Sequence, residues 1–256
     1  MPKEKAPEEV RWDRMTAPQL RTLARRKTVV IIPLGATEQH GQHLPTQVDW
    51  RLAYEIAQRA ARQMQGGQRA IVTPAIPFGM SEHHMSLGGT ITLNYATMSA
   101  VVGCVVRSAA RHGFKRIFVL NGHGGNIAAL ETIITELTVE LKLPLAGGTY
   151  WHIAAESIAG ILEQQTSLLH ACEAETSMMM AVAADCVRAE RIAAAVPRRF
   201  SPANPPGFKR SRNFDAMTDT GVIGDPSRAS AAKGKRLLEA GAARLAEELG
   251  RAELWS

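Results

Sequence analysis

The chain of 256 residues contains little cysteine, few aromatic residues and no long hydrophobic run. Its three cysteines, Cys104, Cys172 and Cys186, lack paired metal-binding spacing, and their odd number argues against a disulfide framework. No apolar run approaches the roughly 18 residues that a membrane span needs. The charged N-terminal residues lack the apolar core of a signal peptide. These absences predict a cytoplasmic protein without a membrane partner.

The scarcity of aromatic residues also bears on the positive charge of the chain. Aromatic residues make up 5% of the sequence, and the formal net charge is +6. Nucleic-acid binding needs positive charge gathered on one face, with aromatic side chains on which bases can stack. Because neither feature is visible in the sequence, we expect no nucleic-acid partner. The basic stretch Arg198–Arg212 could favour an acidic or phosphorylated substrate, and a solvated loop explains it equally well.

What the sequence does contain is a repeated order of apolar runs and amphipathic segments. Strands are predicted at 28–32, 70–76, 91–93, 115–120 and 145–151, and helices at 12–27, 50–64, 95–112, 127–141, 157–164, 178–184 and 230–249. Strand, turn and helix in this order are typical of a mostly parallel sheet. We therefore predict a single α/β domain over residues 1–256, with residues 1–10 as a loose arm.

The stretch that follows the first predicted strand carries three metal-ligand types. Glu38, His40 and Asp49 lie beyond the apolar run Thr28–Ile32, at the strand's carboxyl end. Ligands of open α/β sheets bind at that edge. Carboxylates with imidazole suit Zn²⁺, Mn²⁺ or Fe²⁺. Taken alone, the stretch is a polar loop, with Asp49 serving as the cap of the following helix.

Further polar residues follow the other predicted strands. His84 follows the strand predicted at 70–76, and His123 follows the strand predicted at 115–120. A further segment adds His170, Glu173 and Glu175. Because the ends of parallel strands face one edge, these side chains can converge. Their number predicts two metals that share a bridging carboxylate, about 3.5–4 Å apart.

Three motifs together resemble the creatininase (creatinine amidohydrolase) family. They are Gly-Ala-Thr-Glu-Gln-His-Gly at 35–41, Asn-Gly-His-Gly-Gly-Asn at 121–126 and His-Ala-Cys-Glu-Ala-Glu-Thr-Ser at 170–177. The resemblance runs from about Ile31 to the Gly224-Asp225-Pro226 turn. It implies a three-layer α/β/α sandwich with a mostly parallel central sheet, usually assembled as a hexamer. It also implies two divalent metal ions, zinc first, with manganese or iron as alternatives.

The resemblance implies roles for individual residues. Glu38 resembles a ligand of one metal, His40 a ligand of the other, Asp49 the bridge and His123 the partner of Glu38. His170 resembles the proton-shuttling histidine.

One expected ligand is missing from the motif at 121–126. The family histidine is followed by a tyrosine and a liganding glutamate, where this chain has Gly124 and Gly125. We expect Glu173 to replace that metal ligand. Glu175 is the runner-up for it and our candidate for a catalytic carboxylate, although a helix cap also explains Glu175.

These roles predict a metal-dependent amidohydrolase that cleaves a non-peptide C–N bond of a small-molecule amide, such as a lactam or a formamide. A hydroxide that bridges the metals would attack the carbonyl, and His170 or Glu175 would transfer the proton. His84, Thr90 and the amides near Gly124 would orient the substrate, and Trp151 would wall the pocket or pack in the core. A peptidase-like maturation enzyme, a deformylase and a catalytically silent scaffold are the alternatives.

Overall fold

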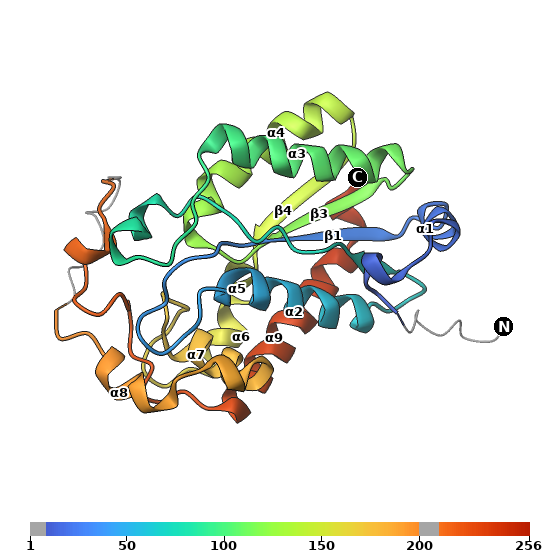
Figure 1. Cartoon of the computed structure of the whole chain (residues 1–256). Coiled ribbons are helices and arrows are strands. Elements are labelled where there is room, and N and C mark those ends of the chain that lie inside the picture. The colour runs from blue at the N-terminus through green and yellow to red at the C-terminus, as the bar shows by residue number, and fades with distance from the viewer. Residues whose placement is uncertain (1–8, 200–209) are drawn as a thin grey trace.

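A computed structural model describes residues 9–199 and 210–256 of the chain (Figure 1). Most of the expected loose arm, residues 1–8, lies outside the described residues. Val10 is buried, and its carbonyl accepts a hydrogen bond from Val72 N at 2.8 Å. The expectation of a loose arm is therefore wrong at Val10, which is fixed to the end of a strand.

The centre of the molecule is a parallel sheet of four strands in the order β2-β1-β3-β4. The strands are β1 (Val29–Leu34), β2 (Ala70–Val72), β3 (Arg116–Asn121) and β4 (Leu145–Thr149). In the register of the two central strands, Leu34 pairs with Asn121. Because β1 and β3 end level with each other, the segments that follow them leave the sheet side by side.

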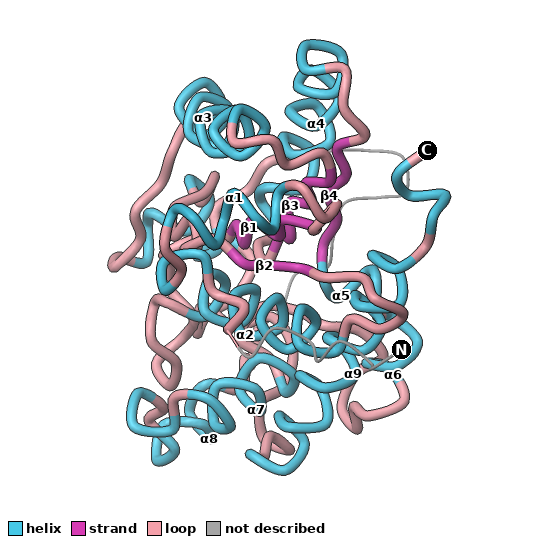
Figure 2. The backbone as a smooth tube through the Cα atoms, turned by 90° about the vertical axis from the view of Figure 1, so that its right-hand side faces the viewer, coloured by secondary structure: helices cyan, strands magenta, loops and turns pink. Residues whose placement is uncertain are grey.

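Helices cover both faces of the sheet, as Figures 1 and 2 show. On one face lie α3 (Tyr95–Arg111) and α4 (Ile127–Leu141), and on the other α2 (Val48–Gln63) and α9 (Ala231–Gly250). Alternate residues of β1 separate the two cores: Val30 and Ile32 belong to the α3/α4 core, and Ile31 belongs to the α2/α9 core. The predicted three-layer α/β/α sandwich is confirmed.

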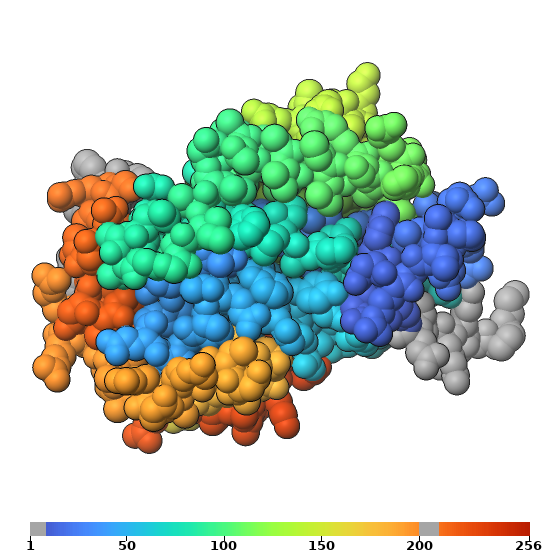
Figure 3. All heavy atoms as spheres, in the orientation of Figure 1, coloured from blue at the N-terminus to red at the C-terminus, as the bar shows by residue number. Residues whose placement is uncertain are grey.

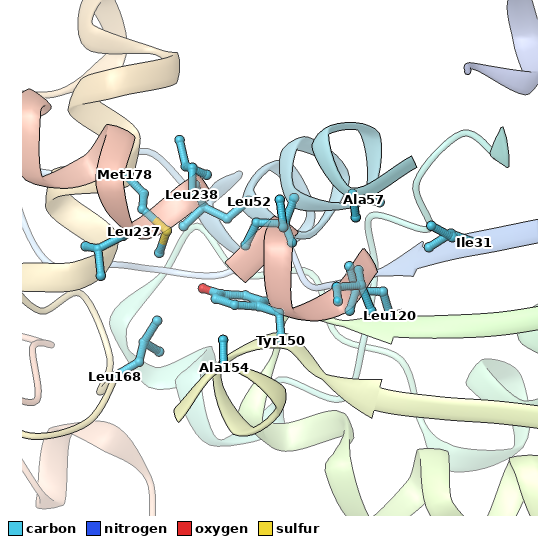
Figure 4. Packing of buried hydrophobic residues seen from close by; sticks show 14 of the residues in the cluster. Ile31, Leu52, Ala57, Leu120, Tyr150, Ala154, Leu168, Met178, Leu237 and Leu238 are labelled. Carbon is cyan, nitrogen blue, oxygen red and sulfur yellow. The ribbon is translucent and has the colours of Figure 1, made fainter. Parts of the chain in front are cut away.

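The α2/α9 core extends beyond the sheet towards a further helix. Figure 4 shows Ile31, Leu52, Tyr150 and Leu237 in one cluster, with Met178 at its far side. Met178 belongs to α7 (Glu173–Val182), which packs against α9. Shorter helices complete the chain: α1 (Ala17–Ala24), α5 (Tyr150–Ile153), α6 (Ala155–Ala159) and α8 (Ile192–Ala195).

Several predicted elements differ from the observed ones. The single helix expected at 12–27 is a 3₁₀ turn, Trp12–Arg14, followed by α1. The strand expected at 91–93 forms only isolated bridges, Ile91 to Thr37 and Thr92 to Gly79. The helix expected from residue 178 begins at Glu173. This last shift places Glu173 and Glu175 on the first turn of a helix rather than on a loop.

No helix within residues 9–199 and 210–256 combines the length and the apolar character that crossing a bilayer requires.

Candidate metal centre

The polar residues of the first motif meet at the carboxyl edge of the sheet. Glu38 and His40 follow β1, and Asp49 lies in the first turn of α2, whose N-cap residue is Gln47. His123 follows β3, and Glu175 comes from the first turn of α7. All five side chains are buried. Asp49 is therefore inside its helix, and the interpretation of Asp49 as a helix cap is wrong.

Two glycines let α2 approach this edge closely. A Cβ atom at Gly35 would lie 2.3 Å from Trp50 N, and one at Gly122 would lie 2.4 Å from Asp49 O. No side chain fits at such distances, so both strand ends need glycine. The close approach carries Asp49 into the space between the residues that follow β1 and β3.

The side chains form two ligand groups that share Asp49. One group is Glu38, Asp49 and His123, and the other is His40, Asp49 and Glu175. A third group, Glu38, His40 and His170, lacks Asp49; the ligand atoms of each group lie within 4.8 Å of one another. Asp49 Oδ1 lies 3.0 Å from His40 Nε2, and Asp49 Oδ2 lies 3.0 Å from His123 Nδ1. Thus the two carboxylate oxygens of Asp49 face different histidines.

Backbone carbonyls orient both histidines. His40 Nδ1 lies 3.1 Å from Glu38 O, and His123 Nε2 lies 3.1 Å from Met80 O. A carbonyl oxygen only accepts, so these nitrogens carry the hydrogens. The other ring nitrogens, His40 Nε2 and His123 Nδ1, face the carboxylates and would present their lone pairs to a cation bound between them. Metal-binding histidines characteristically donate from the other ring nitrogen in this way.

The donor atoms fit a pair of divalent cations. Among the described residues, Glu38 Oε2, His40 Nε2 and Asp49 Oδ2 are buried and have no hydrogen-bond partner. Buried polar atoms without partners are costly, which makes a cluster of them exceptional. Carboxylate oxygens with imidazole nitrogens are the donors that zinc, manganese and iron accept. Cations bound here would compensate all three atoms.

The pKa values of the cluster point to the same need for positive charge. Burial raises the pKa of Glu38, and it raises the pKa of Glu175 to about 8. Burial opposes a charge on His40, but the nearby Asp49 carboxylate outweighs it and raises the pKa of His40 to about 9. In the same way, Glu38 and Asp49 raise the pKa of His123. The carboxylates thus attract cations to this site.

Glu173 lies outside both ligand groups. Its carboxylate accepts hydrogen bonds from Glu163 N at 3.1 Å and Gln164 N at 2.8 Å, and it pairs with Lys233 Nζ. Helical residues two positions apart point about 200° apart, because each residue turns the helix by about 100°. With Glu175 in the cluster, Glu173 faces away from it. The expectation that Glu173 is a metal ligand is therefore wrong, and Glu175 is the carboxylate of α7 that joins a ligand group.

Glu175 also makes the local contact that a helix cap would make. Its Oε2 accepts a hydrogen bond from Ala171 N, just before α7, and lies 3.8 Å from His40 Nε2. The capping interpretation and the ligand interpretation are both compatible with this position.

A cavity of 260 Å³ opens beside the cluster. His170 faces it with Nδ1, which lies 3.5 Å from Glu38 Oε1, while its Nε2 lies 2.9 Å from Gln39 O. Burial and the nearby His40 hold the pKa of His170 well below its usual value, so the ring is neutral.

The expected substrate-binding residues divide into two sets. His84, Gly124 and Trp151 line the cavity. Thr90 stands apart from it in the described structure, and its hydroxyl accepts a hydrogen bond from Gln39 N at 3.1 Å. Sequence reasoning missed the walls Leu168, Leu169 and Phe214, and it did not assign His83 to the cavity that His83 also lines. No motif marks the three wall residues, because their position depends on loops that return to the sheet edge.

A wider groove continues from the cavity. It has a volume of 920 Å³ and meets the cavity at His83, Gly124 and Gly125. Tyr95, Arg210 and Arg212 lie along it. The cavity beside the cluster therefore adjoins a space larger than itself.

Comparison with known proteins places this arrangement in a family. The family described as creatininase (creatinine amidohydrolase) matches residues 13–249, and the chain belongs to that family. The chain is 33% identical over 223 residues to the mycofactocin precursor peptide peptidase of Mycobacterium tuberculosis (strain CDC 1551 / Oshkosh), covering 82% of this chain and 80% of that protein. It is 27% identical over 231 residues to the creatinine amidohydrolase of Pseudomonas putida, covering 82% and 84%. A solved creatininase with manganese superimposes with a TM-score of 0.79 at 25% identity, covering 94% of this chain and 97% of that one.

Proposed function

We propose that this protein is a two-metal amidohydrolase that cleaves a non-peptide C–N bond in a small-molecule amide. The observation that carries the proposal is the pair of ligand groups that share Asp49, with three buried polar atoms that lack partners in the described structure. Glu38 and His123 would hold one cation, His40 and Glu175 the other, and Asp49 both. Solved creatininases contain manganese or two zinc ions, which supports zinc or manganese here; iron suits the same donors.

The chain's own residues supply orientation, proton transfer and exclusion of water. Divalent cations at these ligands would polarise an amide carbonyl and lower the pKa of water from 15.7 towards roughly 7. Neutral His170, with Nδ1 towards the cavity, would accept the proton of the attacking water and return it to the leaving nitrogen. Leu168 and Phe214 would exclude bulk water from the substrate, and the backbone near Gly124 would orient it.

A catalytically silent scaffold is a weaker explanation of the same geometry. A protein that needed only the fold would gain nothing from buried Glu38, His40 and Asp49 atoms without partners. Such atoms destabilise a fold unless a ligand compensates them.

Peptide cleavage is the second candidate function. The 260 Å³ cavity holds only a small group, whereas the adjoining 920 Å³ groove could hold further residues of a longer substrate. The similarity to a peptide peptidase favours the same candidate. The positive charges of Arg210 and Arg212 along the groove would favour an acidic chain.

Metal analysis combined with a substrate panel tests the function. The protein is purified without chelator, its metal content per chain is measured, and it is assayed against lactams, cyclic ureides, formamides and short acidic peptides. We expect about two equivalents of metal, as in two-metal hydrolases, and turnover of one substrate class. Protein that binds no Zn²⁺, Mn²⁺ or Fe²⁺ after their addition would overturn the proposal. Turnover confined to peptides would select the second candidate.

We further propose that the chain forms a homo-oligomer, a hexamer by resemblance to the family, and acts in the cytoplasm. Within the described residues, six of the seven exposed large hydrophobic side chains lie between Phe78 and Val101. This part of the chain, teal to green, is at the surface in Figure 3. Exposed apolar side chains gathered in one segment support a subunit interface. Light scattering on the purified protein measures the number of subunits directly.

A further inference from the structure

Gln39, between the two metal-ligand residues of the first motif, has all its polar atoms engaged. Its side chain is 8% exposed. Gln39 N donates to Thr90 Oγ1 at 3.1 Å, and its side-chain Oε1 accepts from Gly41 N at 2.9 Å. Its Nε2 donates to Gly221 O at 3.1 Å and lies 2.9 Å from His84 Nδ1. Gln39 therefore bonds to residues that are far apart in the sequence, among them His84 and Gly221.

The amide orientation of Gln39 follows from two fixed neighbours. Gly41 N only donates, so it requires the oxygen, and Gly221 O only accepts, so it requires the nitrogen. A Cβ atom at Gly221 would lie 2.3 Å from Gln39 Oε1, and Gly221 has a φ of +78°. Glycine at this turn lets the loop lie directly against the amide.

This orientation determines where His84 carries its hydrogen. The remaining Nε2 hydrogen of Gln39 points to His84 Nδ1, which must then be the acceptor. The ring hydrogen of neutral His84 consequently lies on Nε2, which is 3.2 Å from Glu38 Oε1. His84 thus donates a hydrogen bond to a carboxylate of the metal cluster.

The backbone of Gln39 does the same for His170. His170 Nε2 lies 2.9 Å from Gln39 O and 3.2 Å from Gln39 Nε2. Because the carbonyl only accepts, the hydrogen of His170 lies on Nε2, and its Nδ1 is left as an acceptor facing the cavity. Gln39 therefore makes His84 Nε2 a donor to Glu38 and leaves His170 Nδ1 as an acceptor.

We propose that Gln39 is a positioning residue that fixes the tautomers of His84 and His170, and through His84 holds Glu38 in its metal-binding orientation. The inference rests on the proposed metal site, because Glu38 is one of its ligands. Outer hydrogen-bond partners of this kind typically contribute about 10–100-fold to metal affinity.

A double-mutant cycle on zinc binding tests the link from Gln39 through His84. Zinc dissociation constants are measured by competition with a chromophoric chelator for the wild type, Gln39→Met, His84→Phe and the double variant. We expect each single change to weaken the binding of one of the two zinc ions by about 10–100-fold. The dissociation constant of the other zinc ion should change by no more than about twofold. The double variant should be no weaker than the weaker single variant. Effects that multiply would overturn the link.

Gln58→Met is the matched control. Gln58 is a buried glutamine of α2 that is 7% exposed, and its side-chain amide contacts Tyr54 O and Arg62 rather than the cluster. We expect its zinc constants to match those of the wild type. Equal weakening by Gln58→Met would mean that loss of any buried amide explains the result, and the inference would fail.

Nitrogen NMR of metal-free protein labelled with ¹⁵N-histidine tests the tautomers without metal or activity. The two rings are assigned through the loss of their signals in His84→Phe and His170→Phe. We expect hydrogen on Nε2 of both rings in the wild type. In Gln39→Glu the His84 hydrogen should move to Nδ1, because a carboxylate only accepts. Hydrogen on Nδ1 of His84 in the wild type would overturn the inference.

These measurements separate the inference from the proposed function. A wild type that binds no zinc overturns the two-metal function, while the NMR result still decides the tautomers. A wild type that binds two zinc ions, with Gln39→Met binding both equally well, overturns the inference alone.

Discussion

Two carboxylates on the first turn of α7 enter contrasting surroundings. Glu173 is fully buried and pairs with Lys233, while two backbone amides donate to it. Lys233 in turn donates to Arg228 O at 2.8 Å and lies 2.8 Å from Glu163. Glu175, two residues later, joins Asp49 and His40 in a cluster in which His40 Nε2 and Asp49 Oδ2 have no hydrogen-bond partner.

The difference shows how a structural ion pair is told from a binding site. Around Glu173 each charge has a partner within the chain. Burial opposes the charge of Lys233, but its bonds to Glu163 and Glu173 outweigh burial and raise the pKa of Lys233. Around Glu175 several acids and imidazoles share too few hydrogens. Burial alone is common to both regions, so the completeness of pairing is the informative property.

Removing the carboxylate shared by both ligand groups should have the largest effect. Asp49→Asn keeps the size of the side chain but removes its charge, so we expect metal content to fall from near two equivalents to near zero. Activity should fall by more than about 100-fold, the upper end for loss of a mere outer partner. Elemental analysis and the hydrolysis assay measure both. Asp13→Asn, at an exposed position, is the control, and full metal content in Asp49→Asn would contradict the cluster.

Glu175→Gln should remove one of the two metals. Because burial raises the pKa of Glu175 to about 8, the ionised side chain destabilises the metal-free fold as the pH rises above the unfolded value of 4.5. We expect the metal-free variant to be as stable as the wild type or more stable at pH 8, as measured by urea unfolding. If Glu175→Gln retained two equivalents of metal, Glu175 would serve only as a helix cap.

Gly125→Ala should weaken the metal bound through His123. A Cβ atom at Gly125 would lie 2.3 Å from Met80 O and 2.4 Å from His123 Nε2, the pair whose hydrogen bond orients the ring. We expect about 10–100-fold weaker zinc binding in a chelator competition. The matched control is Gly124→Ala, whose Cβ would meet nothing within 4 Å. Equal zinc affinity in the two variants would show that zinc binding does not depend on the hydrogen bond between His123 and Met80 O.

Glu173→Gln should leave both metals bound and lower stability. The substitution leaves Lys233 paired only with the exposed Glu163, and breaking a buried ion pair typically costs about 3–5 kcal/mol. Urea unfolding of metal-free protein measures this loss, and elemental analysis checks the two equivalents. Loss of one metal without loss of stability would restore Glu173 as a ligand and reverse the comparison.

The smallest expected effect is at alkaline pH. The folded-state pKa of Lys233 is raised, so the stability that its charge contributes is complete below the unfolded value of about 10.4 and is lost as the pH rises through the folded value. The difference in unfolding free energy between the wild type and Glu173→Gln should therefore be constant from pH 7 to 9 and shrink above about pH 10.4. A difference that grows with pH would contradict the pairing.

The sequence predicted which residues lie at the carboxyl edge of the sheet, because polar motif residues follow the apolar runs that form its strands. The strands of the core and α4, observed at Ile127–Leu141 as predicted, follow from hydrophobic pattern and glycine turns. The four ligand-group members Glu38, His40, Asp49 and His123 follow directly from that order.

The error at Glu173 came from the start of α7. With the helix taken to begin at residue 178, Glu173 and Glu175 were both free to face the cluster, whereas the helix begins at Glu173 and fixes them on different sides. A signal was present in Lys233, which shares a helical face with Leu237 in α9 and so predicts a buried acidic partner. The cavity walls Leu168 and Phe214 depend on long-range loop packing that no local pattern encodes.

The ligand residues and the cavity walls come largely from different halves of the sequence. Glu38, His40, Asp49 and His123 come from the first half of the sequence, while the apolar walls Trp151, Leu168, Leu169 and Phe214 come from the second half. Wall side chains can therefore be changed without altering the glycine-packed strand ends that position these four ligand residues. Because His170 and Glu175 also come from the second half, the walls are best exchanged as single side chains that leave these two residues in place.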